Sequence, residues 1–297
     1  MFDIETIYEA ESLSHAVKLL NEHPRAVIIA GGSDVLIKIR DNKLAGCEFL
    51  SIQSLNELRG ISIKEDGMLC IGPLESFSHI ANNPVIKQHI SVLGEAASTV
   101  GGPQIRNIGT IGGNICNGVT SADTASTLLA WDARLELTSF KGTRHISISN
   151  FYKSSGKVDV NIGEILTSIL IPKDSYYSYH GYFYKYSARN AMDISTCNCS
   201  VNVKLSEDKK TIEDVRAAYG AAGPVPLRAY TAENIIKHKK ISLNLIHEFT
   251  ETVIENLKPR SSYRASSDFR AHIIKELSMK CLTESIKRCG GVINGAV

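Results

Sequence analysis

The chain has 297 residues and almost balanced charge, with 33 Lys and Arg against 31 Asp and Glu. This length can bury one large core or two ordinary ones, and the charge balance gives no general attraction to nucleic acid or anionic lipid. No basic patch precedes an apolar run at the N-terminus, and no segment approaches the roughly 20 apolar residues of a membrane span. We therefore expect a cytoplasmic protein without nucleic-acid or membrane partners.

The first part of the chain predicts a helix, a buried strand and a hairpin. Residues 11–22 carry apolar side chains at helical spacing, with Ser12 as a possible cap. Residues 27–30 form an apolar run typical of a buried strand, and Gly31-Gly32-Ser33-Asp34 predicts a tight loop at its end. Residues 61–72 predict a hairpin with a two-residue turn at Asp66-Gly67.

The middle of the chain predicts helices and strands on either side of a glycine-rich stretch. Residues 84–100 predict a single helix that ends at Gly101-Gly102-Pro103. The stretch GGPQIRNIGTIGGNICNG, residues 101–118, is interpreted as loop. The elements expected after it are a helix at 122–133, strands at 134–140 and 144–149 around a turn at 141–143, and a strand at 163–172.

Residues 173–181 are polar and aromatic and indicate a domain boundary. Strands followed by helices, without strict alternation, are typical of an α+β fold. We expect two domains, residues 1–174 and 175–297. The elements expected after the boundary are strands at 181–189, 199–205 and 211–223 and helices at 228–239, 244–257 and 267–288.

Two glycine-rich segments, IIAGGSD and GTIGGNICNG, share one kind of chemistry. Glycine lets a ligand approach the backbone, so successive N–H groups can converge on an anion, and phosphate is the usual occupant. An ordinary turn is the alternative interpretation of either segment alone, but two such segments favour a ligand site. Neither the dinucleotide fingerprint GxGxxG nor a P-loop is present.

Other candidate residues are weaker. The chain has no HExxH and no GxSxG, and the spacings of its seven cysteines fit neither an iron–sulfur cluster nor a disulfide framework, so we assign it no metal site. The Cys197-x-Cys199 pair fits strand packing, with a metal or redox role as the alternative. For Asp123 the alternative to a ligand role is a helix cap, and for Lys185 and Arg189 a solvated sheet face is an equally good explanation.

In order along the chain, AGGSD, GGPQIRNIGTIGGNICNG with TSADT, GEIL and YKYSARNAMDIS resemble the FAD-binding medium subunits of molybdenum hydroxylases, in particular those of bacterial xanthine dehydrogenases. The resemblance extends from the first residues to about Arg288. It implies a two-part FAD-binding domain of the p-cresol methylhydroxylase type, made of two α+β halves, and a small C-terminal flavoprotein domain of sheet and helices.

The resemblance also implies which residues hold FAD without a covalent bond. Asp123 would bind ribityl or ribose hydroxyls, Leu166 would pack near the adenine or the ring system, and Lys185 would lie beside the isoalloxazine and stabilise its reduced form. Arg189, a candidate to attract the acceptor, and Asp193 would lie in a loop that screens the flavin. The pyrophosphate would lie between a first loop, Ile28, Ile29, Ala30, Gly31, Gly32, Ser33, Asp34 and Val35, and a second, Gly109, Thr110, Ile111, Gly112, Gly113 and Asn114.

Two details of this assignment follow from single positions. Gly112 is expected at a positive φ angle, where a branched side chain would strain the loop. Val100 stands where animal relatives carry a phenylalanine packed against the flavin, which leaves the external electron acceptor open.

The implied function is electron transfer. FAD would accept electrons from 2Fe-2S clusters of a small partner subunit and pass hydride to NAD, while a large partner subunit with molybdopterin oxidises a purine. Two alternatives stay open: an FAD subunit that serves carbon monoxide, nicotinate or aromatic-thioester oxidation, and a nucleotide-binding scaffold subunit without redox activity.

Overall fold

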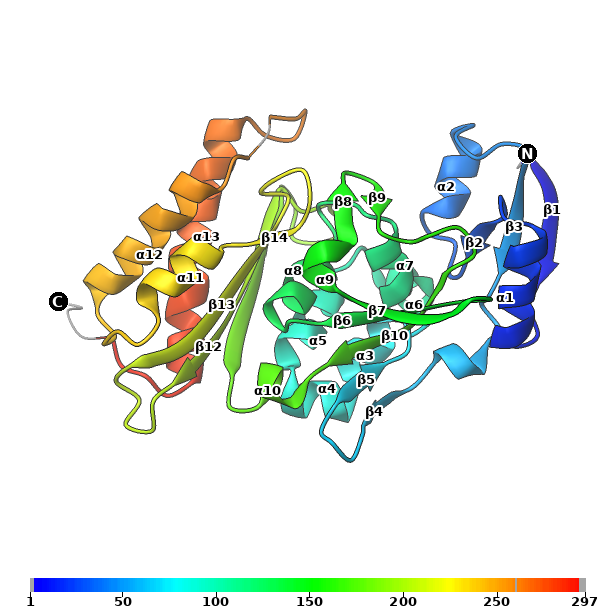
Figure 1. Ribbon diagram of the computed structural model, residues 1–297. Helices are drawn as coiled ribbons and strands as arrows, with labels where there is room; N and C mark the ends of the chain where they lie inside the picture. Colours follow the sequence, from blue (N-terminus) through cyan, green and yellow to red (C-terminus); the bar gives the residue numbers. More distant parts are fainter. Residues whose placement is uncertain (1–2, 260, 294–297) are drawn as a thin grey trace.

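The computed structural model describes residues 3–259 and 261–293, which form three units along the molecule (Figure 1). A parallel three-stranded sheet lies in the N-terminal lobe (residues 4–58), an antiparallel five-stranded sheet in the central lobe (residues 61–176), and an antiparallel four-stranded sheet in the C-terminal unit (residues 180–288). Separate sheets with helices packed on them confirm the expected α+β class.

The N-terminal lobe supports the first glycine loop. Ser12 caps α1, as expected, and α1 buries Ala16, Val17 and Leu20 against the sheet. Strand β2 pairs in parallel with β3 and delivers the chain directly into the loop. The elements of the N-terminal lobe are β1 (Ile4–Glu9), α1 (Leu13–Glu22), β2 (Val27–Ile29), α2 (Val35–Arg40), β3 (Cys47–Ser51) and a 3₁₀ turn (Asn56–Leu58).

The central lobe surrounds the largest core, and Trp131 is fully buried in it. The strand order is β4-β5-β10-β6-β7. The elements are β4 (Ile61–Ile63), β5 (Leu69–Ile71), α3 (Phe77–Asn82), α4 (Pro84–His89), α5 (Ser91–Ser98), α6 (Pro103–Ile108), α7 (Ile111–Cys116), α8 (Asp123–Ala130), β6 (Arg134–Ser139), β7 (Gly142–Ser147), α9 (Ile148–Phe151), β8 (Tyr152–Ser154), β9 (Lys157–Val158), β10 (Ile165–Ile171) and α10 (Lys173–Tyr176).

Three local predictions in this lobe were wrong. The single helix expected at 84–100 is two, because Ile90 leaves the helical conformation at φ −141° while its side chain stays in the core. The hairpin turn at Asp66-Gly67 is longer than two residues, since Lys64 N–H donates to Met68 O and Gly67 N–H to Lys64 O. The glycine-rich stretch is mostly helical: it forms α6 and α7.

The C-terminal unit has the strands and helices that the sequence predicted. Helices α11–α13 cover one face of the sheet, and α8 of the central lobe lies against the other (Figure 1). The unit is built from β11 (His180–Tyr186), β12 (Cys197–Leu205), β13 (Ile212–Gly220), β14 (Leu227–Arg228), α11 (Tyr230–Ile236), α12 (Leu243–Asn256) and α13 (Ser267–Arg288).

Strand β12 has two different faces because successive side chains alternate. Cys197, Cys199 and Val201 pack into the core beneath α12 and α13. The opposite face carries Asn198, Ser200 and Asn202, all fully buried, and Asn202 donates to the Ala130 carbonyl at the end of α8. We call this contact between α8 and β12 the polar seam. The alternation confirms that the Cys197 and Cys199 thiols are packing groups.

Candidate functional site

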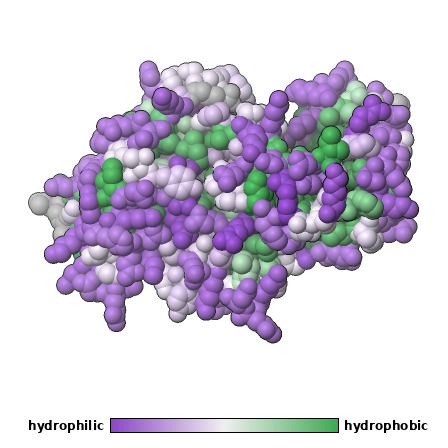
Figure 2. All heavy atoms as spheres, in the orientation of Figure 1, coloured by the Kyte–Doolittle hydropathy of each residue, from purple (hydrophilic) through white to green (hydrophobic). Residues whose placement is uncertain are grey.

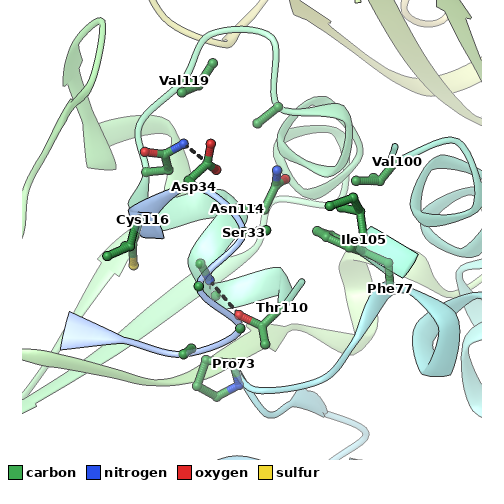
Figure 3. Close-up of a pocket in the computed structure, with 18 of the residues that line it drawn as sticks. Ser33, Asp34, Pro73, Phe77, Val100, Ile105, Thr110, Asn114, Cys116 and Val119 are labelled. Carbon is green, nitrogen blue, oxygen red and sulfur yellow. Dashed lines mark hydrogen bonds between the residues drawn. The ribbon is translucent and has the colours of Figure 1, made fainter. Parts of the chain in front are cut away.

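A cavity of about 620 Å³ lies between the N-terminal lobe, the central lobe and the segment that precedes β12. Its volume falls within the range of about 300–1,000 Å³ that is usual for small-molecule and cofactor sites. The cavity is open in the close-up view, with the chain leaving β2 on one side and Val100, Ile105 and Phe77 on another (Figure 3).

The loop after β2 forms one wall through close backbone contact. A Cβ on Gly31 would overlap the carbonyl oxygen of Ile108, at the end of α6, so only glycine lets the two segments approach. Gly32 has φ +71°, in the left-handed region that favours glycine. Of the predicted first loop, Ile28 and the residues from Ala30 to Val35 line the cavity, whereas Ile29 does not.

The backbone amides of this loop are available to a ligand. In the part of the chain that the structure describes, the N–H groups of Gly31, Gly32, Ser33 and Asp34 donate to no protein acceptor. Four consecutive free N–H groups at the edge of a cavity form a suitable site for an anion, because each can donate one hydrogen bond.

The second glycine segment differs from the prediction. Gly112 lies inside α7 without a positive φ, and a Cβ there would come within 2.5 Å of the Pro73 Cβ and 2.7 Å of its carbonyl oxygen. Its glycine is therefore required by packing and not by backbone conformation. Thr110, Gly112, Gly113 and Asn114 line the cavity, but Gly109 and Ile111 do not.

The amides of α7 are already occupied. Ile111 N–H donates to Glu75 O at 3.0 Å, Gly112 N–H to Pro73 O at 2.8 Å, and Gly113 N–H to the Thr110 hydroxyl at 3.1 Å. The N–H groups of α7 are thus not free as the loop interpretation expected, and this segment can offer a ligand the side chains of Thr110 and Asn114.

Asp123 lies in the cavity wall at the first position of α8. The capping residue is Ala122, so the interpretation of Asp123 as a cap was wrong. One carboxylate oxygen accepts from Lys185 Nζ at 2.7 Å, and the other from Ser195 Oγ at 2.5 Å. Burial raises the pKa of Asp123, while Lys185, Ser195 and Asn198 oppose that shift.

Lys185 lies behind Asp123 and not in the cavity lining. Its Nζ donates to Asp123 and to the Thr99 carbonyl at 3.0 Å, and both side chains of the ion pair are 8 % exposed. The solvated sheet face is therefore the wrong interpretation of Lys185: its positive charge is buried and is compensated by Asp123.

A short loop before β12 reaches the edge of the cavity through Met192, Asp193 and Ile194. Partial burial raises the pKa of Asp193, but hydrogen bonds from the N–H groups of Arg189 and Ile194 lower it by more, so the net shift of this pKa is downward. The Arg189 side chain is 70 % exposed and folds back onto Met192 O and Asp193. Arg189 is not part of the cavity lining.

The remaining walls are mainly apolar, with Lys38, Asn117, Ser121 and Glu164 as further polar lining residues. Leu166, which the resemblance places near the adenine or the ring system, lines the cavity together with Val100, and five apolar lining side chains are at least 38 % exposed to solvent. Figure 2 shows apolar surface between the N-terminal lobe and the rest of the molecule, on a face that is otherwise mainly hydrophilic. An amide-lined edge beside apolar walls suits a ligand with phosphates at one end and a flat ring at the other. The five exposed apolar side chains of the cavity lining are Ile37, Ile105, Val119, Met192 and Ile194.

The sequence analysis gave several residues of the site no role. Asn117 donates to Asp34 at 2.8 Å and accepts from Lys38 at 2.7 Å, which ties the first loop to the end of α7. Ser195 and Asn198 contact Asp123 across more than 70 positions of sequence. Such contacts depend on tertiary approach, which local periodicity does not report.

Two further features are absent from residues 3–259 and 261–293. Within these ranges no three His, Cys, Asp or Glu side chains converge as a metal site would require. No helix there has both the length and the apolarity needed to cross a membrane.

Comparisons with known proteins match the chain over nearly its full length. Residues 2–174 match the family described as FAD binding domain in molybdopterin dehydrogenase, and residues 182–285 match the CO dehydrogenase flavoprotein C-terminal domain. The chain is 38% identical over 291 residues to the xanthine dehydrogenase FAD-binding subunit of Escherichia coli O157:H7, covering 98% of this chain and 99% of that one. It is 32% identical over 276 residues to the glyceraldehyde dehydrogenase medium chain of Sulfolobus acidocaldarius, covering 93% and 96%.

A solved structure shares the fold. Carbon monoxide dehydrogenase from Hydrogenophaga pseudoflava superposes with a TM-score of 0.92 over 97% of this chain and 99% of that chain, at 23% identity.

Proposed function

This chain belongs to the FAD-binding subunits of the molybdenum hydroxylase family and is an oxidoreductase subunit, and on that premise we propose that it takes electrons from iron–sulfur clusters of a small partner subunit and passes them to NAD. When bound, FAD supplies the redox chemistry, and the protein supplies position and electrostatics. The proposal includes a large molybdenum-binding partner that oxidises a purine, and a cytoplasmic heteromer.

The observation that carries the proposal is the row of free N–H groups from Gly31 to Asp34 beside an apolar cavity. Hydrogen bonds from such groups to phosphate are charge-assisted and contribute about 1.5–3 kcal/mol each, so several can hold a pyrophosphate without a lysine or arginine. We assign the pyrophosphate to this loop, with Thr110 and Asn114 as side-chain donors from α7.

The other predicted residues have distinct proposed tasks. Asp123 accepts a hydrogen bond from a hydroxyl of the cofactor, and Leu166 contacts one of its ring systems. Lys185 keeps the buried Asp123 charged, while Arg189 and Asp193 shape the loop at the cavity edge, where the acceptor would approach. Ile29, Gly109 and Ile111 support the two binding segments from behind. The proposed domain boundary stays at residue 174.

The substrate class of the assembled enzyme is the most specific part of the proposal. The relative named for xanthine favours a purine, whereas the relative named for glyceraldehyde shows that subunits of this kind serve different substrates. Hypoxanthine turnover by the chain assembled with its two partner subunits tests the purine assignment. Reduction of the bound flavin by dithionite, followed by reoxidation with NAD, tests the electron path and separates it from a scaffold role.

The binding site itself is tested with one glycine variant and a matched control. Gly31→Ala places a methyl group on the Ile108 carbonyl, so we expect the loop to separate from α6 and FAD to be lost. Gly94→Ala, in α5, adds a methyl group at ordinary contact distance, 3.4 Å from Ile86, and should retain FAD. Full flavin occupancy in Gly31→Ala would contradict the assignment of the pyrophosphate.

A further inference from the structure

The carboxylate of Asp123 is held by residues that follow it by more than 60 positions. Lys185 of β11 donates to one oxygen. Ser195, just before β12, and Asn198 of β12 donate to the other oxygen, at 2.5 Å and 3.5 Å. Asn198 also donates to the Ser195 oxygen at 3.3 Å, so that its amide supports the hydroxyl. Three donors from the C-terminal unit thus converge on one carboxylate of the central lobe.

Ser195 and Asn198 do not line the cavity, and they are 2 % and 0 % exposed. Their side chains reach the cavity through Asp123, which does line it, and Ser195 directly follows Ile194, another lining residue. The backbone next to Ser195 is fixed as well: Thr196 N–H donates to Tyr186 O at 2.9 Å, and the buried Arg270 donates to the Thr196 carbonyl. The hydroxyl is therefore presented from a rigid position.

We propose that Ser195, supported by Asn198, is a positioning residue that orients the Asp123 carboxylate toward FAD, so that the C-terminal unit completes the cofactor site. This inference rests on the proposed function. A carboxylate oxygen that has lost its donors in a buried site is poorly solvated, and the group then turns toward other donors or takes up a proton. Turning moves the acceptor away from the cofactor hydroxyl, and protonation removes its charge, so either change weakens that hydrogen bond.

The experiment measures the affinity of the full chain for FAD by titrating the flavin-free protein. We expect Ser195→Ala to weaken FAD binding about tenfold or more, as the loss of a hydrogen bond to a charged group does. Ser195→Thr keeps the hydroxyl and should restore most of the affinity. Ser200→Ala is the matched control. Ser200 lies on the same buried face of β12 as Asn198, and its hydroxyl has no hydrogen-bond partner in the described part of the chain.

A double-mutant cycle separates positioning from a general structural effect. If Ser195 acts through Asp123, Ser195→Ala should cause no further loss of affinity in an Asp123→Ala chain. Thermal unfolding of each flavin-free variant shows that it is folded. Should Asp123→Ala not fold, the comparison of Ser195→Ala with Ser195→Thr and Ser200→Ala decides the question.

Three results would overturn the inference: wild-type affinity in Ser195→Ala, an equal loss in Ser200→Ala, or no recovery in Ser195→Thr. A full additional loss in the Asp123→Ala background would do the same. Failure of the wild-type chain to bind FAD would instead overturn the proposed function, so the two failures are distinguishable.

Discussion

Replacing Lys185 by methionine removes the cation of a buried ion pair while keeping most of the side-chain volume. Both members of the pair are 8 % exposed, and the structure places no other cation on Asp123 within the residues it describes. Loss of one partner of a buried pair leaves the other charge uncompensated, which typically costs about 3–5 kcal/mol. We expect a loss of this size in the free energy of unfolding of Lys185→Met near neutral pH.

The loss should depend on pH in a defined direction. Burial already raises the pKa of Asp123, and without Lys185 the pKa rises further. A carboxyl group with a raised pKa binds a proton more tightly in the folded than in the unfolded chain, so stability falls as pH rises from the unfolded pKa to the folded one. The variant should therefore be closest to wild type in acid and recover by up to about 1.4 kcal/mol per pH unit on acidification.

The assay is urea unfolding of wild type and variant from about pH 5 to about pH 8, the range in which most proteins are stable. Asp123→Asn added to Lys185→Met is the control, because it removes the titrating carboxyl group, so the double variant should lack the fall in stability with rising pH that this group causes in Lys185→Met. A constant difference across this range, or a difference that grows in acid, would refute the reasoning.

Three further predictions follow from single positions. Gly112→Val should lose FAD and lower the unfolding temperature, because its side chain would collide with Pro73; a folded variant with full flavin occupancy would contradict this. Cys116 lines the cavity, but burial raises the pKa of its thiol to about 12, so iodoacetamide should not modify it at neutral pH, as peptide mass spectrometry can check. Arg228→Met should destabilise the chain by about 3–5 kcal/mol in urea unfolding, since it leaves the buried Glu233 without its ion-pair partner; a loss below about 1 kcal/mol would contradict this.

The sequence predicted the elements of the C-terminal unit well, because their hydrophobic periods are long and regular. It was less successful between Pro84 and Asn117, where short helices are joined by tertiary packing. There Ile90 interrupts a pattern that reads as one helix, and the N–H groups of α7 find acceptors in Pro73 and Glu75, far away in sequence. Local propensity does not contain that information.

The candidate site was predictable only where local sequence carries information about it. Glycines at the end of a strand marked the loop from Gly31 correctly, because a close backbone approach leaves a signature in residue type. Asp123 and Lys185 were identified by the family resemblance, but their pairing was not. The partners Ser195 and Asn198 were given no role: Ser195 closes the motif YKYSARNAMDIS and Asn198 lies outside it, and nothing local shows that the fold brings both to Asp123.

The polar seam between α8 and β12 has a consequence for how the two halves of the molecule separate. Ser126 Oγ, Asn198 Oδ1, Ser200 Oγ and Asn202 Oδ1 are all buried without a hydrogen-bond partner in the described ranges, 3–259 and 261–293. Water would satisfy each of these atoms if the faces came apart, so hydration offsets part of the contact free energy. The polar seam therefore contributes alignment more than binding free energy, and its own polar atoms would be hydrated if α8 and β12 separated.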